Sequence, residues 1–174
     1  MNFVFILNIF YGYFISNSIN YLVNYVKPEN VKKQLQENLV AIIHNFFLGS
    51  FSLLYLINQI NKYNYYNFLG FSLGYLFYDF EKCIKHKRNS LLLHHVIMTF
   101  SIIYTQYFSK YYTIDLAWIC STVYLCEFSN IFLWTYLVLY RLNYNNFLIM
   151  NFFKISIVLT WLFLRIFNFT YILY

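Results

Sequence analysis

The chain has 174 residues, of which 61% are hydrophobic, 25% are aromatic and 10% are charged, and its formal net charge is +6. A soluble domain typically carries about 25% charged residues, so this chain lacks the polar side chains that would cover a globule in water. The composition therefore excludes a soluble domain and predicts a membrane protein. The many Phe, Tyr, Ile, Asn and Lys residues, with only Ala41 and Ala117 as alanines, also indicate a low-GC coding sequence.

Six hydrophobic runs follow one another along the chain, and each is close to the roughly 20 apolar residues that a transmembrane helix needs. They predict an all-α fold, a polytopic transmembrane helical bundle of about six helices. No Lys or Arg precedes the first run and no small-residue cleavage site follows it, which is typical of a retained helix rather than a signal peptide. The expected spans are Phe3–Val26, Leu39–Ile60, Phe68–Ile84, Leu91–Phe108, Ile114–Tyr140 and Phe147–Tyr174.

The connectors between these runs divide the chain and orient it. Residues 1–38 are expected to hold the first transmembrane helix and a short basic amphipathic connector, and residues 39–174 the main transmembrane domain. The second and fourth connectors carry only Lys62 and Lys110, whereas the odd connectors are rich in basic residues. By the positive-inside rule the odd connectors face the cytosol, so the N-terminus is expected to be non-cytosolic. The basic residues of the odd connectors are Lys27, Lys32, Lys33, Lys82, Lys85, Lys87, Arg88 and Arg141.

Charged or titratable side chains also occur within the predicted spans or at their edges. Such groups cost about 2.5 to 3.5 kcal/mol each at a helix centre on insertion scales, so they are the best candidates for function. We expect them to meet in a polar pocket inside the bundle, where carboxylates pair with His or Lys. They are His44, Asp79, His94, His95, Glu127, Lys154 and Arg165.

Each of these candidates has a structural interpretation as well. His94 and His95 could contact lipid head groups at a helix end, and His44 could be a core histidine bonded to a backbone carbonyl. Asp79 could mark the polar end of a span, and Glu127 could be a neutral carboxyl group or a partner of Lys154. A transporter or channel built on the buried charges is disfavoured, because the sequence shows neither Gly/Pro-broken helices nor an inverted repeat.

The sequence gives little sign of a metal, a cofactor or a nucleic-acid partner. Cys83, Cys120 and Cys126 form neither a CxxC pair nor an even disulfide framework, so we expect reduced packing residues. A metal or haem site using the histidines is disfavoured, because adjacent histidines project about 100° apart on a helix. Basic residues lie between hydrophobic runs rather than along one face, and no phosphate-binding glycine loop occurs, so nucleic acid is not expected.

Several motifs occur in the order in which the TLC-domain family of multi-pass membrane proteins carries them, and residues 39–170 resemble that family. The family includes ceramide synthases, translocation-associated proteins and several lipid-handling relatives. Each motif falls on or beside a separate predicted span. The motifs are a His early in a span (His44), Gly74-Tyr75 with Tyr78-Asp79, the paired His94-His95, Glu127-Phe128-Ser129 with Phe132, and a late Arg165-Ile166.

The resemblance implies a helical bundle in the endoplasmic reticulum membrane, with residues 39–174 as a TLC-like domain and the paired histidines in a central cavity. In the ceramide synthases these histidines are associated with acyl transfer from acyl-CoA to a sphingoid amine. The synthases carry a His-Asp and a further Asp after the paired histidines. Residues 118–130 here contain neither His nor Asp and have the Glu-x-Ser form instead. The resemblance is therefore closest to the non-synthase branch.

Two functions follow as expectations, and enzyme and non-enzyme both stay open at this point. The first is a non-synthase TLC-type protein that binds, senses or handles membrane lipid. The second is an acyl-CoA-dependent lipid acyltransferase, with His94 or His95 as catalytic base and Asp79 orienting the imidazole. Expected partners are membrane lipid and a second copy or another membrane protein, with acyl-CoA as a substrate in the second case. The polar pocket is expected to include His44, Tyr75, Glu127, Ser129, Asn130 and Arg165.

Overall fold

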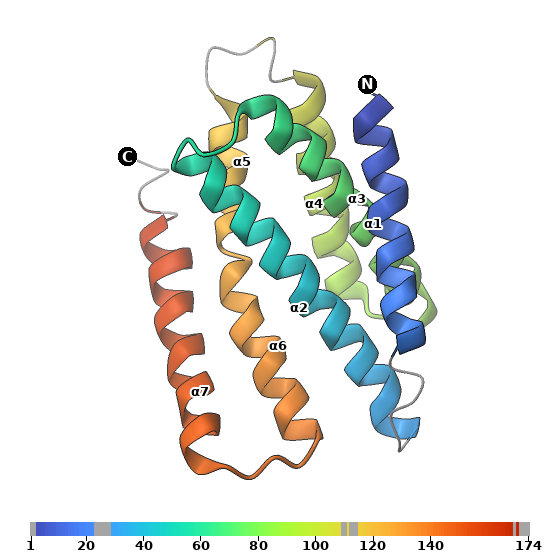
Figure 1. The fold of residues 1–174 in the computed structure, drawn as a ribbon, viewed down its shortest axis with the longest axis vertical. Helices are drawn as coiled ribbons and strands as arrows, with labels where there is room; N and C mark the ends of the chain where they lie inside the picture. The colour runs from blue at the N-terminus through green and yellow to red at the C-terminus, as the bar shows by residue number, and fades with distance from the viewer. Residues whose placement is uncertain (1–2, 23–28, 109–110, 112–114, 169, 171–174) are drawn as a thin grey trace. The chain divides into compact units, whose positions relative to one another are not determined.

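The computed structural model describes residues 3–22, 29–108, 111, 115–168 and 170, and within them the chain is helical and has no strand (Figure 1). The all-α prediction is confirmed. The helices are α1 (Phe3–Leu22), α2 (Glu29–Leu56), α3 (Lys62–Lys85), α4 (Asn89–Phe108), α5 (Leu116–Leu125), α6 (Phe128–Arg141) and α7 (Phe147–Trp161), which a π-helical segment, η2 (Leu162–Phe167), continues.

Some predicted features lie outside the described residues. These are the end of the first span up to Val26, the connector residues Lys27 and Pro28, Lys110 in the fourth connector, Ile114 at the start of the fifth span, and the last span beyond Thr170. The remaining boundaries differ from the predicted ones by a few residues, because α2 and α3 each begin about one to three turns before their apolar runs. Polar helical turns extend a helix beyond its hydrophobic part without any cost in burial.

Four described helical stretches are long and apolar enough to cross a membrane, namely Leu35–Leu56, Asn89–Phe108, Leu116–Arg141 and Phe147–Ile166. The apolar part of α1 is shorter, and α3 has 24 residues but falls outside this set. α3 falls outside this set because its Tyr, Asn, Ser and Gly residues lower its mean hydropathy. Half of its residues are buried, so α3 is shielded by protein and has less need of a lipid-compatible surface.

The predicted fifth span is present as one apolar stretch, Leu116–Arg141, but its helix is not continuous. The helix expected over Ile114–Tyr140 is divided into α5 and α6 around Cys126 and Glu127. Here Glu127 N donates to Tyr124 O and Asn130 N to Glu127 O, both at 3.0 Å, so the bonds span three residues instead of four. Such a 3₁₀ stretch within a helix marks a hinge or a site under strain.

The chain forms two compact units whose segments alternate along the sequence. The first unit comprises Met1–Asn17 and Leu54–Ser121, and the second comprises Ser18–Leu53 and Thr122–Tyr174. Each unit thus combines segments that are distant in sequence. The predicted division at residue 38 was based on membrane topology, whereas these two units are defined by contacts between residues. The division at residue 38 therefore stays a prediction.

In the first unit, α1 and α3 touch through their backbones. A Cβ atom placed on Gly12 would collide with the carbonyl group of Phe71, and one on Gly74 would collide with the carbonyl group of Ile9. Small residues allow this close approach of the two backbones. In a membrane the hydrophobic effect does not hold helices together, so van der Waals contacts at such small residues drive their association instead. Gly70 and Gly74 form a Gly-x-x-x-Gly pattern, which our sequence analysis did not use.

Three helices end in the same way, with a residue at positive φ just after the helix. These residues are Asn58, Lys87 and Asn143, with φ of 58°, 54° and 54°. After α3, for example, the amide of Arg88 donates to the carbonyl oxygen of Cys83 at 3.0 Å, which is the longer bond of a Schellman motif. Asn tolerates this conformation better than Lys does. These motifs stop the helices at short connectors and fix the direction of the next helix.

The contact between α1 and α3 predicts that Gly74→Ala destabilises the protein, by about 1 to 3 kcal/mol as for other overpacked sites. In an exposed helix the same change would stabilise by roughly 1 kcal/mol, because Ala has the higher helix propensity. Thermal unfolding in detergent measures the difference. Phe77→Leu on the exposed face of α3 is the matched control and should melt within a degree or so of wild type. A Gly74→Ala protein that melts above wild type would contradict the backbone contact.

Candidate functional site

A buried pair of titratable residues joins α3 to α4 in the first unit. The Nε2–H of His95 donates to Oδ2 of Asp79 at 2.5 Å, and the two side chains are 6% and 15% exposed. The other ring nitrogen of His95, Nδ1, is buried and has no hydrogen-bond partner among the described residues. We call Asp79 and His95 the dyad. Its carboxylate fixes the orientation of the imidazole and leaves one ring nitrogen available to a further group.

The two adjacent histidines have different environments, as expected for neighbours on a helix. His95 is buried beside Asp79, whereas the side chain of His94 is exposed. The two rings lie 5.5 Å apart between centroids at a tilt of 57°. The sequence left open which histidine would be the catalytic base, and the geometry favours His95. Tyr75 is buried next to it, with its ring edge-on to the imidazole at 6.5 Å.

A second polar cluster lies in the second unit at the break between α5 and α6. Asn130 donates from Nδ2 to Oε2 of Glu127 at 2.6 Å and accepts at Oδ1 from Nη2 of Arg165 at 3.0 Å. Its amide thus lies between a carboxylate and a guanidinium group and bonds to both. We call Glu127, Asn130 and Arg165 the Glu–Asn–Arg chain. The paired opposite charges lower the cost of placing each group in a membrane span.

Two backbone irregularities meet at this cluster. The end of α5 contacts η2, where Cys126 Sγ donates to the carbonyl oxygen of Leu164 at 2.6 Å and Asn168 Nδ2 donates to that of Thr122 at 2.6 Å. A π-helical turn leaves backbone carbonyls without their usual i+4 donors, and the thiol of Cys126 supplies a donor to one of them, that of Leu164. Ser129 likewise donates its hydroxyl to the carbonyl oxygen of Cys126 at 2.7 Å, which helps to separate α6 from α5.

The residues of the predicted single pocket are divided between the two units. The dyad and Tyr75 belong to the first unit, and the Glu–Asn–Arg chain and Ser129 belong to the second. His44 is buried in the second unit, with Nδ1 at 3.3 Å from Oδ1 of Asn45. Each group is described within its own unit, and a shared cavity stays a prediction. Lys154 lies over the ring of Tyr136, 5.9 Å from its centroid.

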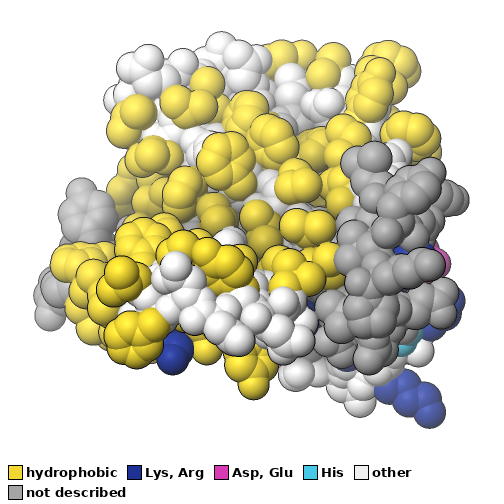
Figure 2. Space-filling view, turned by 60° about the horizontal axis from the view of Figure 1, so that its bottom comes forward, with side chains coloured by type: hydrophobic (Ala, Val, Ile, Leu, Met, Phe, Trp, Pro, Cys, Tyr) yellow, Lys and Arg dark blue, Asp and Glu magenta, His cyan; other side chains and the backbone are white. Residues whose placement is uncertain are grey.

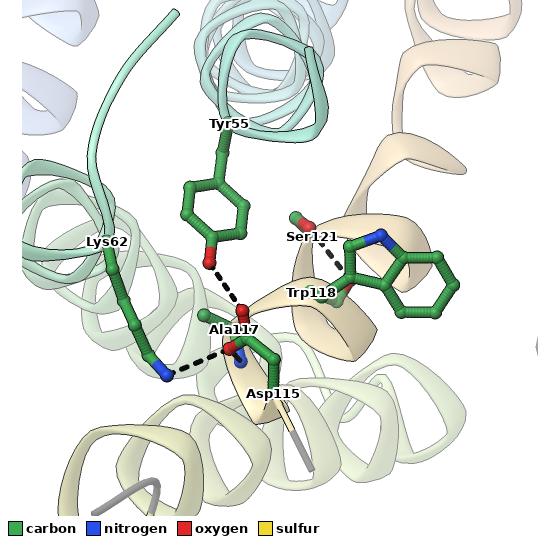
Figure 3. A network of polar contacts seen from close by, with 6 residues as sticks. All are labelled: Tyr55, Lys62, Asp115, Ala117, Trp118 and Ser121. Carbon is green, nitrogen blue, oxygen red and sulfur yellow. Dashed lines mark hydrogen bonds and ion pairs between the residues drawn. The ribbon is translucent and has the colours of Figure 1, made fainter. Parts of the chain in front are cut away.

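A third polar network was not predicted from the sequence (Figure 3). The carboxylate of Asp115 accepts a hydrogen bond from the hydroxyl of Tyr55 at 2.8 Å and lies 2.9 Å from Nζ of Lys62. It also accepts from the amide of Ala117 at 3.0 Å and so caps the start of α5. The ion pair connects the second and fourth connectors, as two connectors on the same side of a membrane would allow.

The charges of this network are mutually stabilised. Burial opposes the charged forms of Asp115 and Lys62, but their hydrogen bonds and the attraction between their opposite charges outweigh this effect. The pKa of Asp115 is therefore lowered by its bonds to Lys62 and Tyr55, and the pKa of Lys62 is raised by its bond to Asp115. Both side chains are more than two-fifths exposed, so water weakens the interaction. The sequence signal was an Asp directly before an apolar run, which is a helix N-cap pattern.

One group of residues in the described part of the chain could hold a metal ion. Asp79, Cys83 and His95 each offer a ligand atom, and these atoms lie within 4.8 Å of one another. Among the histidines and carboxylates that the sequence indicated as candidates, only Asp79 and His95 belong to this metal-binding group. Cys83 was expected to be a packing residue, and it approaches Asp79 because positions 79 and 83 are one helical turn apart.

The apolar helices and buried polar clusters together are typical of an α-helical membrane protein. No family model, curated protein or solved structure matches the chain. The fold class therefore rests on the helices themselves, and the function is argued from the clusters.

The network around Asp115 predicts that Asp115→Asn and Asp115→Ala have different effects. Asn keeps an oxygen that can cap α5 but removes the ion pair, so we expect a loss of about 0.2 to 1 kcal/mol. Ala also removes the cap, which adds about 1 kcal/mol. Thermal melting of the two variants at neutral pH measures both terms. Equal melting temperatures for Asn and Ala would contradict the capping role.

The same pair has a pH dependence of defined sign. Because the pKa of Asp115 is lowered in the folded state, its contribution is present above its ordinary value of 3.8 and is lost as the pH falls through the folded-state pKa. Because the pKa of Lys62 is raised, its contribution is present below 10.5 and is lost above it. The stability difference between wild type and Asp115→Asn should therefore be constant near neutral pH and shrink below about pH 4.

The Glu–Asn–Arg chain predicts non-additive mutations. Glu127→Leu or Arg165→Leu alone leaves the opposite charge without its counterpart, and each should cost about 1 to 3 kcal/mol. The double variant Glu127→Leu, Arg165→Leu removes both charges and should cost less than the sum of the two. Melting temperatures of the three variants test this. Additive losses would show that the two charges do not interact through Asn130.

Proposed function

We propose that this protein is a TLC-type integral membrane protein that binds or handles a membrane lipid through the buried dyad. The observation that carries the proposal is the hydrogen bond between His95 and Asp79. These residues belong to two separate motifs of the resemblance, and their pairing gives both motifs a common role. A buried imidazole with an available ring nitrogen can bond to the amine, hydroxyl or amide of a lipid, which supports this use.

The surface of the protein supports contact with lipid. Hydrophobic side chains cover much of the face seen in Figure 2, and few charged side chains appear on it. The last helix, α7, has no buried residue, and its exposed side chains include Phe147, Leu148 and Phe152. A helix with mostly apolar side chains and no buried residue is stable in lipid and unfavourable in water.

A hollow of about 490 Å³ at the connector between α6 and α7 is compatible with a phosphate-bearing head group. Its lining includes Arg141 and Lys154 together with the hydroxyl groups of Tyr136, Tyr140 and Tyr144. The sequence from residue 128 to residue 174 contains no Asp or Glu that could compete for these cations. Basic and aromatic side chains at the end of a membrane helix are typical of contacts with anionic lipid.

The membrane and the orientation belong to the same proposal. The endoplasmic reticulum follows from the resemblance, and a non-cytosolic N-terminus follows from the basic residues of the odd connectors. The ion pair between Lys62 and Asp115 is in keeping with this topology, because it joins two connectors expected on one side. A second copy of the chain or another membrane protein would be a natural partner for the exposed apolar helices.

An acyltransferase is the second candidate, and the dyad favours it as well. His95 would take the proton from the amine or hydroxyl of the acceptor, while the acceptor attacks the thioester carbonyl of acyl-CoA. The bond from carbon to sulfur then breaks, and the imidazolium returns the proton to the CoA thiolate. Asp79 would stabilise the positive charge that His95 carries between these two proton transfers.

The dyad predicts which histidine matters for lipid. The lipid that co-purifies with wild type should be retained by His94→Ala and reduced about tenfold or more in His95→Gln, as expected for the loss of roughly 1.4 kcal/mol of contact. Gln can still donate to Asp79 and so limits the effect on folding. Native mass spectrometry with lipid extraction on detergent-purified protein gives the comparison.

The same three proteins separate the two candidate functions. Transfer of a labelled acyl group from acyl-CoA to a sphingoid amine, present in wild type and His94→Ala but absent in His95→Gln, would establish the acyltransferase. Lipid retention without transfer would support lipid handling alone. Equal lipid content in wild type and His95→Gln, or no specific lipid in either, would refute a role of the dyad in lipid binding.

A further inference from the structure

We propose that Asp79, Cys83 and His95 form a binding site for one Zn²⁺ ion. One ligand atom from each residue lies within 4.8 Å of the other two. Asp79 and Cys83 come from successive turns of α3, and His95 comes from the second turn of α4. Two ligands on one helix and a third on a helix connected by a short loop form a compact site with little freedom. Such a donor set of sulfur, nitrogen and oxygen suits Zn²⁺.

Burial separates this group from accidental clusters of polar residues. The side chain of Cys83 is 1% exposed and that of His95 is 5% exposed. Exposed carboxylates often lie close together without binding any ion, whereas this group lies among packed helices inside the first unit. The side chain of Asp79 retains 15% exposure and is therefore the one through which an ion could enter.

Charge balance favours a divalent ion at this position. A Cys thiolate and an Asp carboxylate together carry two negative charges, and neutral His adds none. A bound Zn²⁺ makes the group neutral, which removes the penalty for burying uncompensated charge in a medium of low dielectric constant. A monovalent ion would leave a net negative charge buried, and it coordinates thiolate poorly.

The imidazole of His95 is only partly satisfied by hydrogen bonds within the described structure. Its Nδ1 is buried and has no hydrogen-bond partner within the described structure, although the residue is more than nine-tenths buried. A buried polar atom without a partner destabilises the folded protein. Metal binding uses one ring nitrogen and leaves the other to donate to a carboxylate or carbonyl, which is the common arrangement of zinc-bound histidine.

Only a small rearrangement is needed to admit the ion. Zn²⁺ binds His nitrogen and carboxylate oxygen at about 2.0 to 2.2 Å, which separates the two ligand atoms by roughly 3.3 Å in a tetrahedral site. The present distance between His95 Nε2 and Asp79 Oδ2 is 2.5 Å. Three protein ligands leave a fourth position open, as in zinc sites that bind a water molecule or a substrate oxygen.

This inference does not depend on the proposed lipid function, because metal content is measured without any lipid. The test compares wild type with Cys83→Ser and with Cys120→Ser, its matched control. Cys120 is also a buried cysteine of the first unit, with 4% exposure, but it belongs to no group of metal-binding side chains in the described structure. Full-length protein is purified in detergent, loaded with ZnSO₄ or CoCl₂, desalted and analysed for metal by mass spectrometry.

We expect about one Zn²⁺ per chain in wild type and in Cys120→Ser, and at least tenfold less in Cys83→Ser. Bound Co²⁺ should give a thiolate-to-metal charge-transfer band in the first two proteins and none in the third. Asp79→Asn should also lose most of the metal. Wild type without stoichiometric metal after loading, or Cys83→Ser with as much metal as wild type, would overturn the site. Lipid measured on the same samples shows separately whether the lipid proposal stands.

Discussion

The interior of a membrane offers no water to polar groups, so each buried polar side chain must find its partner within the protein. Several buried polar side chains of the described structure follow this constraint, although Nδ1 of His95 does not. Asp79 bonds to His95, and Glu127 and Arg165 are connected through the amide of Asn130. Polar contacts in this chain therefore act together with close packing at glycines in deciding which helices associate. The lipid-facing side chains contribute little to that choice.

The sequence predicted the parts of the structure that depend on composition and periodicity. The apolar runs placed the helices, because a run of about 20 hydrophobic residues has few other stable conformations in lipid. The polar residues within those runs identified His95 and Asp79, because an ionisable group in a span needs a compensating partner. A single shared pocket was a further step. It assumed that all of the polar groups meet, and it stays a prediction because these groups belong to two units that are described separately.

Other features depended on contacts that a single sequence does not reveal. The break at Glu127 occurs inside an apolar run with no Pro or Gly, and it depends on bonds from Ser129 to Cys126 and from Cys126 to Leu164 of η2. The role of Cys83 became visible only when His95 was placed beside the turn that carries it. Asp115 was overlooked because it lies at a helix end, where a carboxylate is common. Its partner Lys62 is more than fifty positions away in the sequence.

The lack of any buried residue in α7 has a consequence for how the protein is made. A helix of this kind enters the bilayer on its own hydrophobicity, before it has found its place among the others. Until then the guanidinium group of Arg165 is exposed to hydrocarbon, at a cost of about 2.5 to 3.5 kcal/mol on insertion scales. Docking against Asn130 relieves that cost. Insertion of the last helix thus precedes its assembly with the other helices. The contact of Arg165 with Asn130 then favours assembly over separation.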